Sequence, residues 1–434
     1  MLTQPNKIAL SALLLALLEP QLGLADQFHY NNIIMGDRAM GLGGAFAGAA
    51  DDASGLIYNP AGIAFAQSNE ISASGNAFYE RKVTYKEAIV GDDYIEDSKG
   101  SVSPFLGGLV KMDSVMPGVT LAWGVFNRDA ELKTQDDLIE NKGNIQRFHR
   151  AVNVRAQTGG FGIAAAKRLA SSLSAGLSLS YILLDELTQD YQDAQQVVTD
   201  SSGTAVVQLL TQNDRRRLEG AAMEIGLGLQ YSVLPDLSLG LSVKIPQMMS
   251  QSFENGFEQT VLQSADSFAT ISSAMTRQVG NKGASEISNP IGSLPSEYRL
   301  GLAWFASTGL LITADVINYS AIKGDLSIYE RVAITNYAAG LEWYITPNVP
   351  MRFGVFTNND ARPKIDESKT DQQDNIDYMG YSMFFVWAQP NSQISLGGIY
   401  QAGKGKAQKI GNTTTTQDVE ASSTTLAFSA STNI

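Results

Sequence analysis

A stretch rich in glycine and alanine, GLGGAFAGAADDASGLIYNPAGIAF at residues 41–65, is the first feature that suggests chemistry. Glycine-rich loops bind phosphate groups when they follow G-x-G-x-x-G after a strand, or when they end in Gly-Lys-Ser or Gly-Lys-Thr. Gly41, Gly43 and Gly44 do not complete the first pattern, because position 46 is phenylalanine, and the second pattern does not occur here. The stretch therefore does not predict a nucleotide site.

Residues suited to acid–base or metal chemistry are scarce. The chain has no cysteine and two histidines, His29 and His149, which stand far apart in the sequence. Two isolated histidines give neither a nucleophile–base arrangement nor the spacing of a metal-ligand cluster. We therefore predict no enzyme activity, no catalytic residue, no metal site and no cofactor.

The composition and the first residues indicate an exported chain. Charged residues make up 17% of the sequence, against about 25% in a typical soluble domain, and the formal net charge is −13. This acidic balance argues against nucleic acid as a partner. Lys7 precedes an apolar run at residues 8–18, and Gly23-Leu24-Ala25 fits a cleavage site. Residues 1–25 are therefore predicted to be a signal peptide, and no later segment is apolar for long enough to predict a transmembrane helix.

Most of the mature chain alternates apolar and polar residues with period two, which is the pattern of β-strands. In residues 223–232, for example, Met223, Ile225 and Leu227 share one face with Leu229 and Tyr231. Such runs occur in pairs around short turns, which predicts β-hairpins and about fourteen strands in total. The predicted strands are 70–79, 105–112, 118–127, 150–168, 173–184, 223–232, 237–245, 298–306, 310–319, 335–345, 350–357, 377–388, 393–401 and 419–430.

The connections between these runs alternate strictly between short and long. This is typical of outer-membrane barrels, which have short periplasmic turns and long extracellular loops. The alternative, a soluble β-sandwich, would carry more charge on its solvated face. The predicted long loops are 80–104, 128–149, 185–221, 248–296, 321–333, 359–376 and 403–417.

The two faces of the predicted strands support a membrane barrel. Tyr231, Tyr298, Trp304, Tyr337 and Trp343 lie on the apolar face, as an aromatic girdle requires. The polar face consists mostly of small residues, and its few charges can pair inside a lumen. These charged residues are Glu224, Lys244, Arg299, Asp315, Glu342 and Arg352.

The segment 26–68, which precedes the first strand, is too apolar for a solvated tail. Its clustered glycines and alanines allow close packing of the backbone. Residues 51–54 are predicted to cap a short helical turn that Asn59-Pro60 ends. A barrel of about fourteen strands has room for such a plug in its lumen. The alternative is a flexible leader outside the barrel.

The sequence GDRAMGLGGAFAGAADDASGLIYNPAGIAF, residues 36–65, resembles the N-terminal hatch of the FadL/TodX family of outer-membrane transporters. The triplet Asn59-Pro60-Ala61 after an Ala-Asp-Asp-Ala run is its most distinctive part. The later stretches LPSEYRLGLAWFASTGLLITADVINYS and YAAGLEWYITPNVPMRFGVF resemble strand–turn–strand units of that family. The resemblance implies a fourteen-stranded barrel with the hatch inside it, which takes up long-chain fatty acids or aromatic hydrocarbons.

In that family the third and fourth extracellular loops form a helical groove for the ligand. The resemblance assigns this groove to loops 185–221 and 248–296. In the second loop, apolar residues follow one another at steps of three or four, which fits an amphipathic helix. The alternative is an ordinary folded loop. The residues at these steps are Phe257, Val261, Ala265, Phe268, Ile271 and Met275, of which we predict Phe257, Val261, Phe268 and Ile271 to contact ligand.

The resemblance also implies a second site in the lumen, where a ligand carboxylate would need a cation. Lys244, Arg299 and Arg352 are candidates because they face inward, although they can instead pair with neighbouring acidic residues. Shifts of the hatch would open a path, and a kink in the third strand, 118–127, would give a lateral exit. Gly124 is the candidate for that kink, since glycine in a strand often marks a bulge. The alternative is an ordinary strand glycine. The predicted hatch and gating residues are Gly43, Gly44, Asn59, Pro60, Ala61 and Gly124.

The sequence as a whole predicts an all-β transmembrane barrel of the outer membrane. Its parts are a signal peptide (1–25), a hatch (26–68) and a barrel (69–434), whose last strand ends at Phe428 or slightly beyond. The predicted function is passive uptake of hydrophobic small molecules. The expected partners are such a ligand, outer-membrane lipid and lipopolysaccharide, and the barrel assembly machinery. Two alternatives stay open: a barrel that binds protein partners in secretion or surface display, and a general porin.

Overall fold

The computed structural model describes residues 27–89, 91–143, 145–199, 205–265, 271–272, 287, 289–370, 372–408 and 414–434. The predicted signal peptide lies outside this range. Among the described residues, no helix is long and apolar enough to cross a membrane. The short helices are α2 (Asp37–Gly41), α3 (Gly55–Tyr58), η1 (Gly62–Phe65) and η2 (Ser327–Tyr329). The strands are β1 (Glu70–Ile89), β2 (Asp92–Lys111), β3 (Val119–Lys142), β4 (Ile145–Ala170), β5 (Leu173–Thr199), β6 (Ala205–Leu234), β7 (Leu237–Ala265), β8 (Ile271–Ser272), β9 (Glu297–Ser307), β10 (Leu310–Tyr319), β11 (Ile334–Thr346), β12 (Val349–Asn358), β13 (Asn375–Gln389), β14 (Ser392–Ala407) and β15 (Gln417–Asn433).

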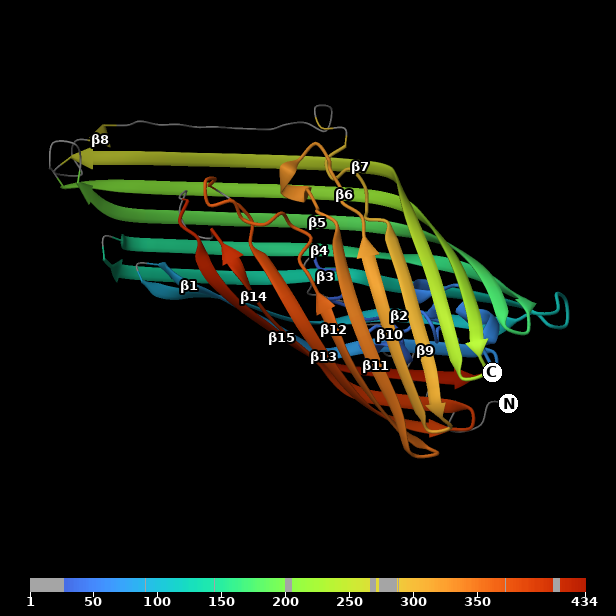
Figure 1. The fold of residues 1–434 in the computed structure, drawn as a ribbon. Helices are drawn as coiled ribbons and strands as arrows, with labels where there is room; N and C mark the ends of the chain where they lie inside the picture. Colours follow the sequence, from blue (N-terminus) through green and yellow to red (C-terminus); the bar gives the residue numbers. More distant parts are fainter. Residues whose placement is uncertain are drawn as a thin grey trace.

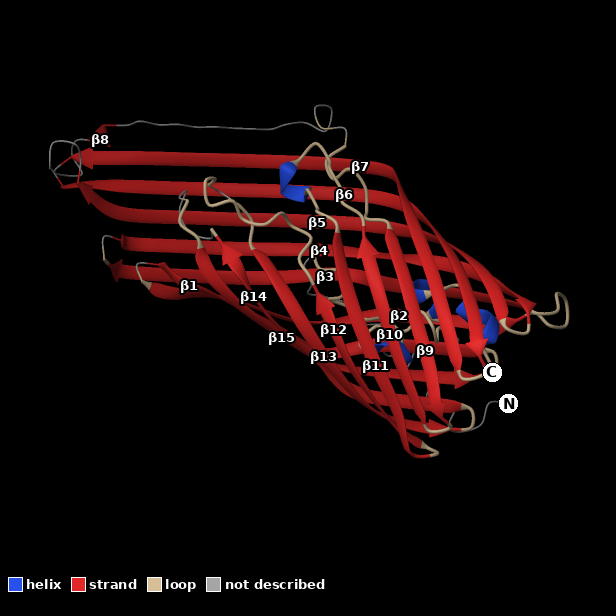
Figure 2. Ribbon diagram, in the orientation of Figure 1, coloured by secondary structure: helices blue, strands red, loops and turns tan. Residues whose placement is uncertain are grey.

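Fourteen of these strands close into one antiparallel barrel, as the sequence predicts (Figures 1 and 2). Consecutive strands pair around the ring, and the short strand β8 is an additional strand beside β7. The first strand β1 pairs with the last strand β15, which closes the ring between the two ends of the chain. Closure matters because a sheet in lipid has no water to satisfy an open edge.

The outer face of the wall exposes apolar side chains, as contact with lipid requires, and the inner face is buried. In β3, Trp123 and Val125 point outward and are 42% and 53% exposed. Ala122 and Phe126, on either side of this pair, point inward and are buried. The five aromatic residues predicted for the girdle are also exposed on the outside. A band of exposed apolar side chains of this extent would be unstable in water, but it matches the hydrocarbon region of a bilayer. The chain is therefore a multi-pass membrane β-barrel.

Several predicted long loops are strands. The segments 80–104, 128–149 and 185–221 continue the hairpins on either side of them, and β3 to β7 run far beyond the neighbouring strands (Figure 1). The β5–β6 ladder, for instance, continues from Asp185↔Glu219 to Thr199↔Ala205. Beyond the lipid, the outward face of these strands becomes largely polar, and the inward face mixes charged residues with a small buried cluster that includes Tyr85, Tyr94 and Phe148. The clear apolar alternation therefore ends while the backbone pairing continues. The connections 321–333 and 359–376 are loops, as predicted.

The predicted amphipathic helix is wrong over its first part. Residues 257–265 belong to β7, where Phe257 pairs with Asp214 and Val261 with Leu210 of β6. Pairing with β6 along its whole length decides the conformation of this segment, and the spacing of a few apolar residues does not override it. Ile271 lies in β8, and Phe268 and Met275 lie outside the described residues.

The predicted kink in the third strand is not at Gly124. This glycine pairs in register with Gly107 of β2 and with Gly162 of β4. The irregularity in the β3–β4 ladder lies a few residues further on, between Asn127 and Asp129. Gly124 is therefore an ordinary strand glycine in its pairing, and its predicted gating role stays untested.

The end of the last strand, left open by the sequence, lies beyond Phe428. The strand β15 continues to Asn433, which pairs with Glu70 at the start of β1. Phe428 itself points outward and is 39% exposed. The additional residues extend the seam that closes the barrel.

Candidate functional site

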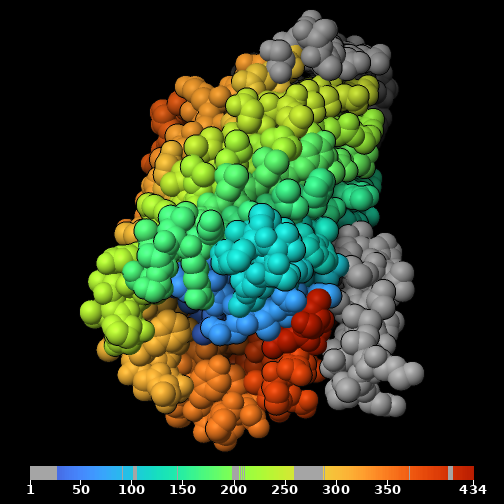
Figure 3. All heavy atoms as spheres, turned by 90° about the vertical axis from the view of Figure 1, so that its right-hand side faces the viewer, coloured from blue at the N-terminus to red at the C-terminus, as the bar shows by residue number. Residues whose placement is uncertain are grey.

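The N-terminal segment 27–69 lies inside the barrel. All residues from 39 to 50 and from 53 to 64 are buried, although this stretch forms only short helical turns. Seen from the end that carries the short turns (Figure 3), blue atoms of this part of the chain lie inside the ring of wall residues. We call residues 27–69 the plug. That it moves as a hatch stays a prediction.

Local sequence explains how the plug turns inside so narrow a space. The carboxylate of Asp52 accepts hydrogen bonds from the backbone N and the Oγ of Ser54, at 2.8 and 2.6 Å, just before α3 begins. The helix ends at Asn59, whose extended backbone precedes Pro60. The short turn predicted between residues 51 and 59 is thus present.

Inward-facing glycines of the wall allow the backbone of the plug to touch the strands. A Cβ atom added to Gly340 would lie 2.7 Å from the Cβ of Leu42, and one added to Gly354 would lie 2.5 Å from the carbonyl carbon of Leu42. These glycines face each other in pairs on neighbouring strands. The belt that they form, which we call the glycine belt, consists of Gly176, Gly228, Gly240, Gly301, Gly340 and Gly354.

The triplet Asn59-Pro60-Ala61 forms a corner that docks the plug on the wall. The side-chain amide of Asn59 donates to Ala47 O at 3.0 Å and to Leu229 O of β6 at 3.1 Å. Its Oδ1 accepts from Ala61 N at 3.1 Å. One side chain therefore joins two parts of the plug and a strand, which accounts for the distinctiveness of this triplet.

Gly43 and Gly44 form the other tight turn of the plug. Their φ angles are +64° and +81°, in the left-handed region that favours glycine. The guanidinium of Arg299 donates to Gly44 O at 3.0 Å. In the next residues, the carboxylate of Asp315 accepts from Phe46 N at 3.1 Å. The predicted gating glycines thus lie where two charged wall residues hold the plug.

A chain of five buried or partly buried charges links the plug to β11 and β12. Arg38 of the plug contacts Asp51 at 3.0 Å and Glu342 of β11 at 2.9 Å. Glu342 in turn binds Arg352 of β12 at 2.7 Å, and Arg352 contacts Asp37 of the plug at 3.0 Å. We call this set the ionic chain. The two contacts between plug and wall, Arg38 with Glu342 and Asp37 with Arg352, join residues more than 300 positions apart, so no sequence spacing could have revealed them.

The three predicted ligand cations all have acidic partners. Lys244 contacts Glu297 at 3.0 Å, and Arg299 contacts both Glu297 and Asp315 at 3.1 Å. Arg352 belongs to the ionic chain and does not line either of the two main cavities. The alternative weighed for these residues, pairing with neighbouring acids, is therefore what the structure shows. Ligand binding by them stays a prediction.

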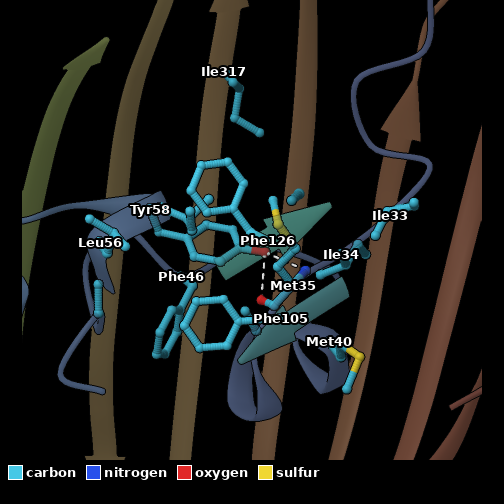
Figure 4. Packing of buried hydrophobic residues seen from close by; sticks show 14 of the residues in the cluster. Ile33, Ile34, Met35, Met40, Phe46, Leu56, Tyr58, Phe105, Phe126 and Ile317 are labelled. Atoms are coloured by element: carbon cyan, nitrogen blue, oxygen red, sulfur yellow. Dashed lines mark hydrogen bonds between the residues drawn. The ribbon is translucent and has the colours of Figure 1, made fainter. Parts of the chain in front are cut away.

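Two cavities inside the barrel are lined in part by residues of the plug. The inner one, of about 110 Å³, is lined by the plug and by the wall, with apolar residues such as Ile33, Ile57 and Ile317. Figure 4 shows Ile33 and Ile317 among buried hydrophobic residues of the plug and the wall. In the same view, Tyr58 holds the backbone of Met35 by hydrogen bonds of 3.0 and 3.1 Å. Apolar atoms make up most of the cavity surface, and the polar part comes from charged side chains such as Lys244, Arg299 and Glu297. A mostly apolar surface with some polar groups is typical of small-molecule sites.

The outer cavity, of about 250 Å³, is more polar. Arg150 lies in its wall between Glu96 at 3.0 Å and Asp190 at 2.6 Å. Gln27 lines both cavities and so marks the boundary between them. Phe257, predicted to contact ligand, lies at neither of these cavities, and the side chains of Val261, Phe268 and Ile271 lie outside the described part of the structure.

The wall changes beside the inner cavity, where the ladder between β2 and β3 ends. The last pair is Phe105↔Phe126, although both strands continue beyond it. Further along, side chains bridge the two strands, as when Gln135 Nε2 donates to Ile95 O at 2.7 Å. This is a place where the wall is held by side chains in place of a backbone ladder.

Comparisons with known proteins place the fold. No family model matches the chain, and no curated protein matches it. Among solved structures, a Pseudomonas aeruginosa FadL homologue is similar with a TM-score of 0.60 and 11% identity, covering 92% of this chain and 99% of that one. The P. putida toluene transporter TodX (TM-score 0.55, 15% identity, 93% and 99% covered) and the Ralstonia pickettii toluene transporter TbuX (0.53, 12%, 92% and 99%) are similar too. The chain therefore has the fold of these transporters, as the sequence resemblance implied.

The glycine belt leads to a first prediction. Replacing Gly340 with valine should loosen the plug, because the new side chain occupies the position of Leu42, and overpacking of this kind costs about 1–3 kcal/mol. Hydrogen exchange followed by mass spectrometry should show faster exchange in residues 37–66. The control is Gly398→Val, where an added Cβ meets no atom closer than 3.3 Å. Equal protection of the plug in both variants would contradict the prediction.

A second prediction concerns pH. Burial raises the pKa of the Asp52 carboxyl to about 6, against the hydrogen bond from Ser54, and the charges of Asp51 and Asp37 raise it further. A raised pKa stabilises the docked plug at low pH, and this contribution is lost as the pH rises through about 6. After correction for intrinsic rates, exchange in residues 37–66 should be slower at pH 5 than at pH 7.5.

The variant Asp52→Asn should remove most of this pH dependence, since asparagine stays neutral and can still accept from Ser54. Glu367→Gln, at an exposed loop position, is the matched control and should behave like the unmodified chain. A plug that keeps its full pH dependence in Asp52→Asn would rule out Asp52 as the cause.

Proposed function

We propose that this protein is an outer-membrane transporter for the passive uptake of hydrophobic small molecules, with residues 26–68 as its hatch and 69–434 as its barrel. The observation that carries this proposal is the inner cavity, whose surface is mostly apolar and which the plug and the wall line together. The fold shared with a FadL homologue and two toluene transporters supports it. Binding and transport then need no chemical step, which agrees with the prediction of a non-enzyme.

The driving force lies in the ligand itself. An apolar molecule that leaves water for an apolar cavity gains about 25 cal/mol per Å² of buried surface. The molecule would enter by the outer cavity and pass Gln27 into the inner cavity. From there it would leave past a shifted plug or laterally beside Phe105 and Phe126, where the β2–β3 ladder ends.

A general porin fits this structure less well. A porin needs a continuous water-filled path, whereas the plug fills the lumen and contacts strands on several sides through the glycine belt. The long sheet of β3 to β7, which projects beyond the other strands (Figure 1), favours a second candidate function, the binding of a protein partner at the cell surface. Uptake measurements distinguish the two candidates.

The third prediction tests uptake directly. A strain that lacks its own transporter should accumulate radiolabelled oleate or toluene faster when it produces this barrel than when it carries an empty vector. The ligand partitions into the inner cavity, so the rate should saturate with concentration. Absence of uptake for both compounds, with the barrel present in the outer membrane, would contradict the proposed function.

The fourth prediction tests the hatch. In Glu342→Gln the ionic chain loses its central carboxylate, and Arg38 and Arg352 are left buried without it. Breaking a buried pair costs about 3–5 kcal/mol, so the plug should spend more time displaced and single-channel conductance should rise. Glu96→Gln is the matched control, because Glu96 forms ion pairs with Arg150 and Lys133, which both belong to the wall. Equal conductance in both variants would mean that the ionic chain does not hold a gate.

A further inference from the structure

Three arginines lie on the outward face of the projecting sheet, on the strands β4 and β6 (Figure 1). Val154 and Ala156 line the outer cavity, so Arg155 between them points away from the lumen. Arg216 also lines the outer cavity, and its neighbours Arg215 and Arg217 are exposed on the other face. We call Arg155, Arg215 and Arg217 the arginine patch.

The arginine patch stands just beyond the apolar band of the same strands. In β5 this band includes Leu183, which is 53% exposed and lies in register with Gly159 of β4 and Ala221 of β6. Four positions further on, Arg155 and Arg217 both lie in register with Leu187 of β5.

The height of the patch follows from strand geometry. Four residues of a strand tilted by about 40° rise by about 10 Å, and Arg215 lies about 5 Å higher. These strand ends lie opposite the short turns, on the extracellular side of an outer-membrane barrel. The polar headgroups begin where the hydrocarbon ends, so the guanidinium groups reach the headgroup layer of the outer leaflet.

Two of these guanidinium groups are available to a ligand. Among the described residues, the side chains of Arg155 and Arg215 make no hydrogen bond or ion pair. Arg217 pairs with Glu219, which lies two positions closer to the apolar band. On the face formed by β14, β15 and β1, by contrast, outward lysines are paired: Lys404 and Lys86 contact Glu420 at 3.3 and 3.5 Å.

Acidic residues border the patch without filling it. Asp185 lies in register with Glu219 on the side of the apolar band, and Glu254 of β7 lies in register with Arg217. Uncharged Asn153 and Gln189 lie in register with each other beside Arg155 and Arg215. The positive charge is therefore concentrated over β4 and β6, directly above the lipid-facing surface.

We propose that the arginine patch binds the phosphate groups of a phosphorylated glycolipid of the outer leaflet, as in lipopolysaccharide. Guanidinium groups donate paired hydrogen bonds to phosphate oxygens, which a lysine ammonium cannot do. Arg155 and Arg217 stand two strands apart, at about 10 Å, so each can hold a separate phosphate. Continuity with the lipid-facing band favours a lipid over an acidic protein as the occupant. The proposal concerns the outer surface and does not depend on the proposed uptake.

The test uses the purified full-length barrel in detergent and native mass spectrometry. The barrel is titrated with lipid A that carries two phosphates and with the same lipid after dephosphorylation, both in the presence of EDTA. The phosphorylated form should bind about tenfold more tightly or better. Each basic residue near an anionic lipid contributes about fivefold in affinity, so the double variant Arg155→Gln/Arg215→Gln should remove most of this preference.

The matched control is Arg147→Gln. Arg147 lies on the outward face of β4 as well, but it contacts Asp193 at 3.9 Å and stands further from the apolar band. Its loss should leave binding of the phosphorylated lipid unchanged. Glu219→Gln frees Arg217 and should keep or strengthen binding.

Three results would overturn the proposal. Equal affinity for the two lipids would show that phosphate is not recognised, and full preference in the double variant would show that the patch does not recognise it. Loss of binding in EDTA would assign the lipid to acidic residues bridged by divalent cations. Uptake of oleate or toluene is measured separately, so the proposed function stands or fails independently of these results.

Discussion

Backbone contact between the plug and the glycine belt is the constraint on which the rest of this structure depends. A side chain at Gly340 or Gly354 would occupy the place of Leu42, and the plug could not lie against β11 and β12. Only at this distance can Arg299 reach Gly44 O and Asp315 reach the backbone of Phe46. The glycine-rich stretch of the plug therefore serves close packing against the glycines of the wall, and it does not form a phosphate loop.

Close packing also changes the meaning of the lumenal charges. Arg299 and Arg352 face inward, as ligand-binding cations would, yet their donors are used to hold the plug and its acidic neighbours. The lumenal charges of this set therefore act as anchors between the plug and the wall.

The sequence predicted the strands correctly where they cross the membrane, because lipid requires apolar residues on the outward face. Trp123 and Val125 had to face outward at every second position, so strands in the membrane were visible. Beyond the membrane the outward face meets water and carries polar residues, so the apolar alternation fades, and strands such as residues 185–199 looked like loops. The helix expected from Phe257 was wrong because pairing with the preceding strand β6, not local spacing, decided the conformation of this segment. The partnership of Arg38 with Glu342 was equally invisible, since only the closed barrel brings them together.

The free energy that a ligand can supply limits the proposed movement of the plug. A body of about six carbons gains roughly 5 kcal/mol on burial, at about 0.8 kcal/mol per methylene. This is similar to the roughly 3–5 kcal/mol that separates a buried ion pair from its broken form. One ligand can therefore offset the loss of one anchor, such as the contact of Arg38 with Glu342, but not the loss of the whole docking surface. A local shift of the turn at Gly43 and Gly44 agrees with that limit, whereas release of the complete plug exceeds it.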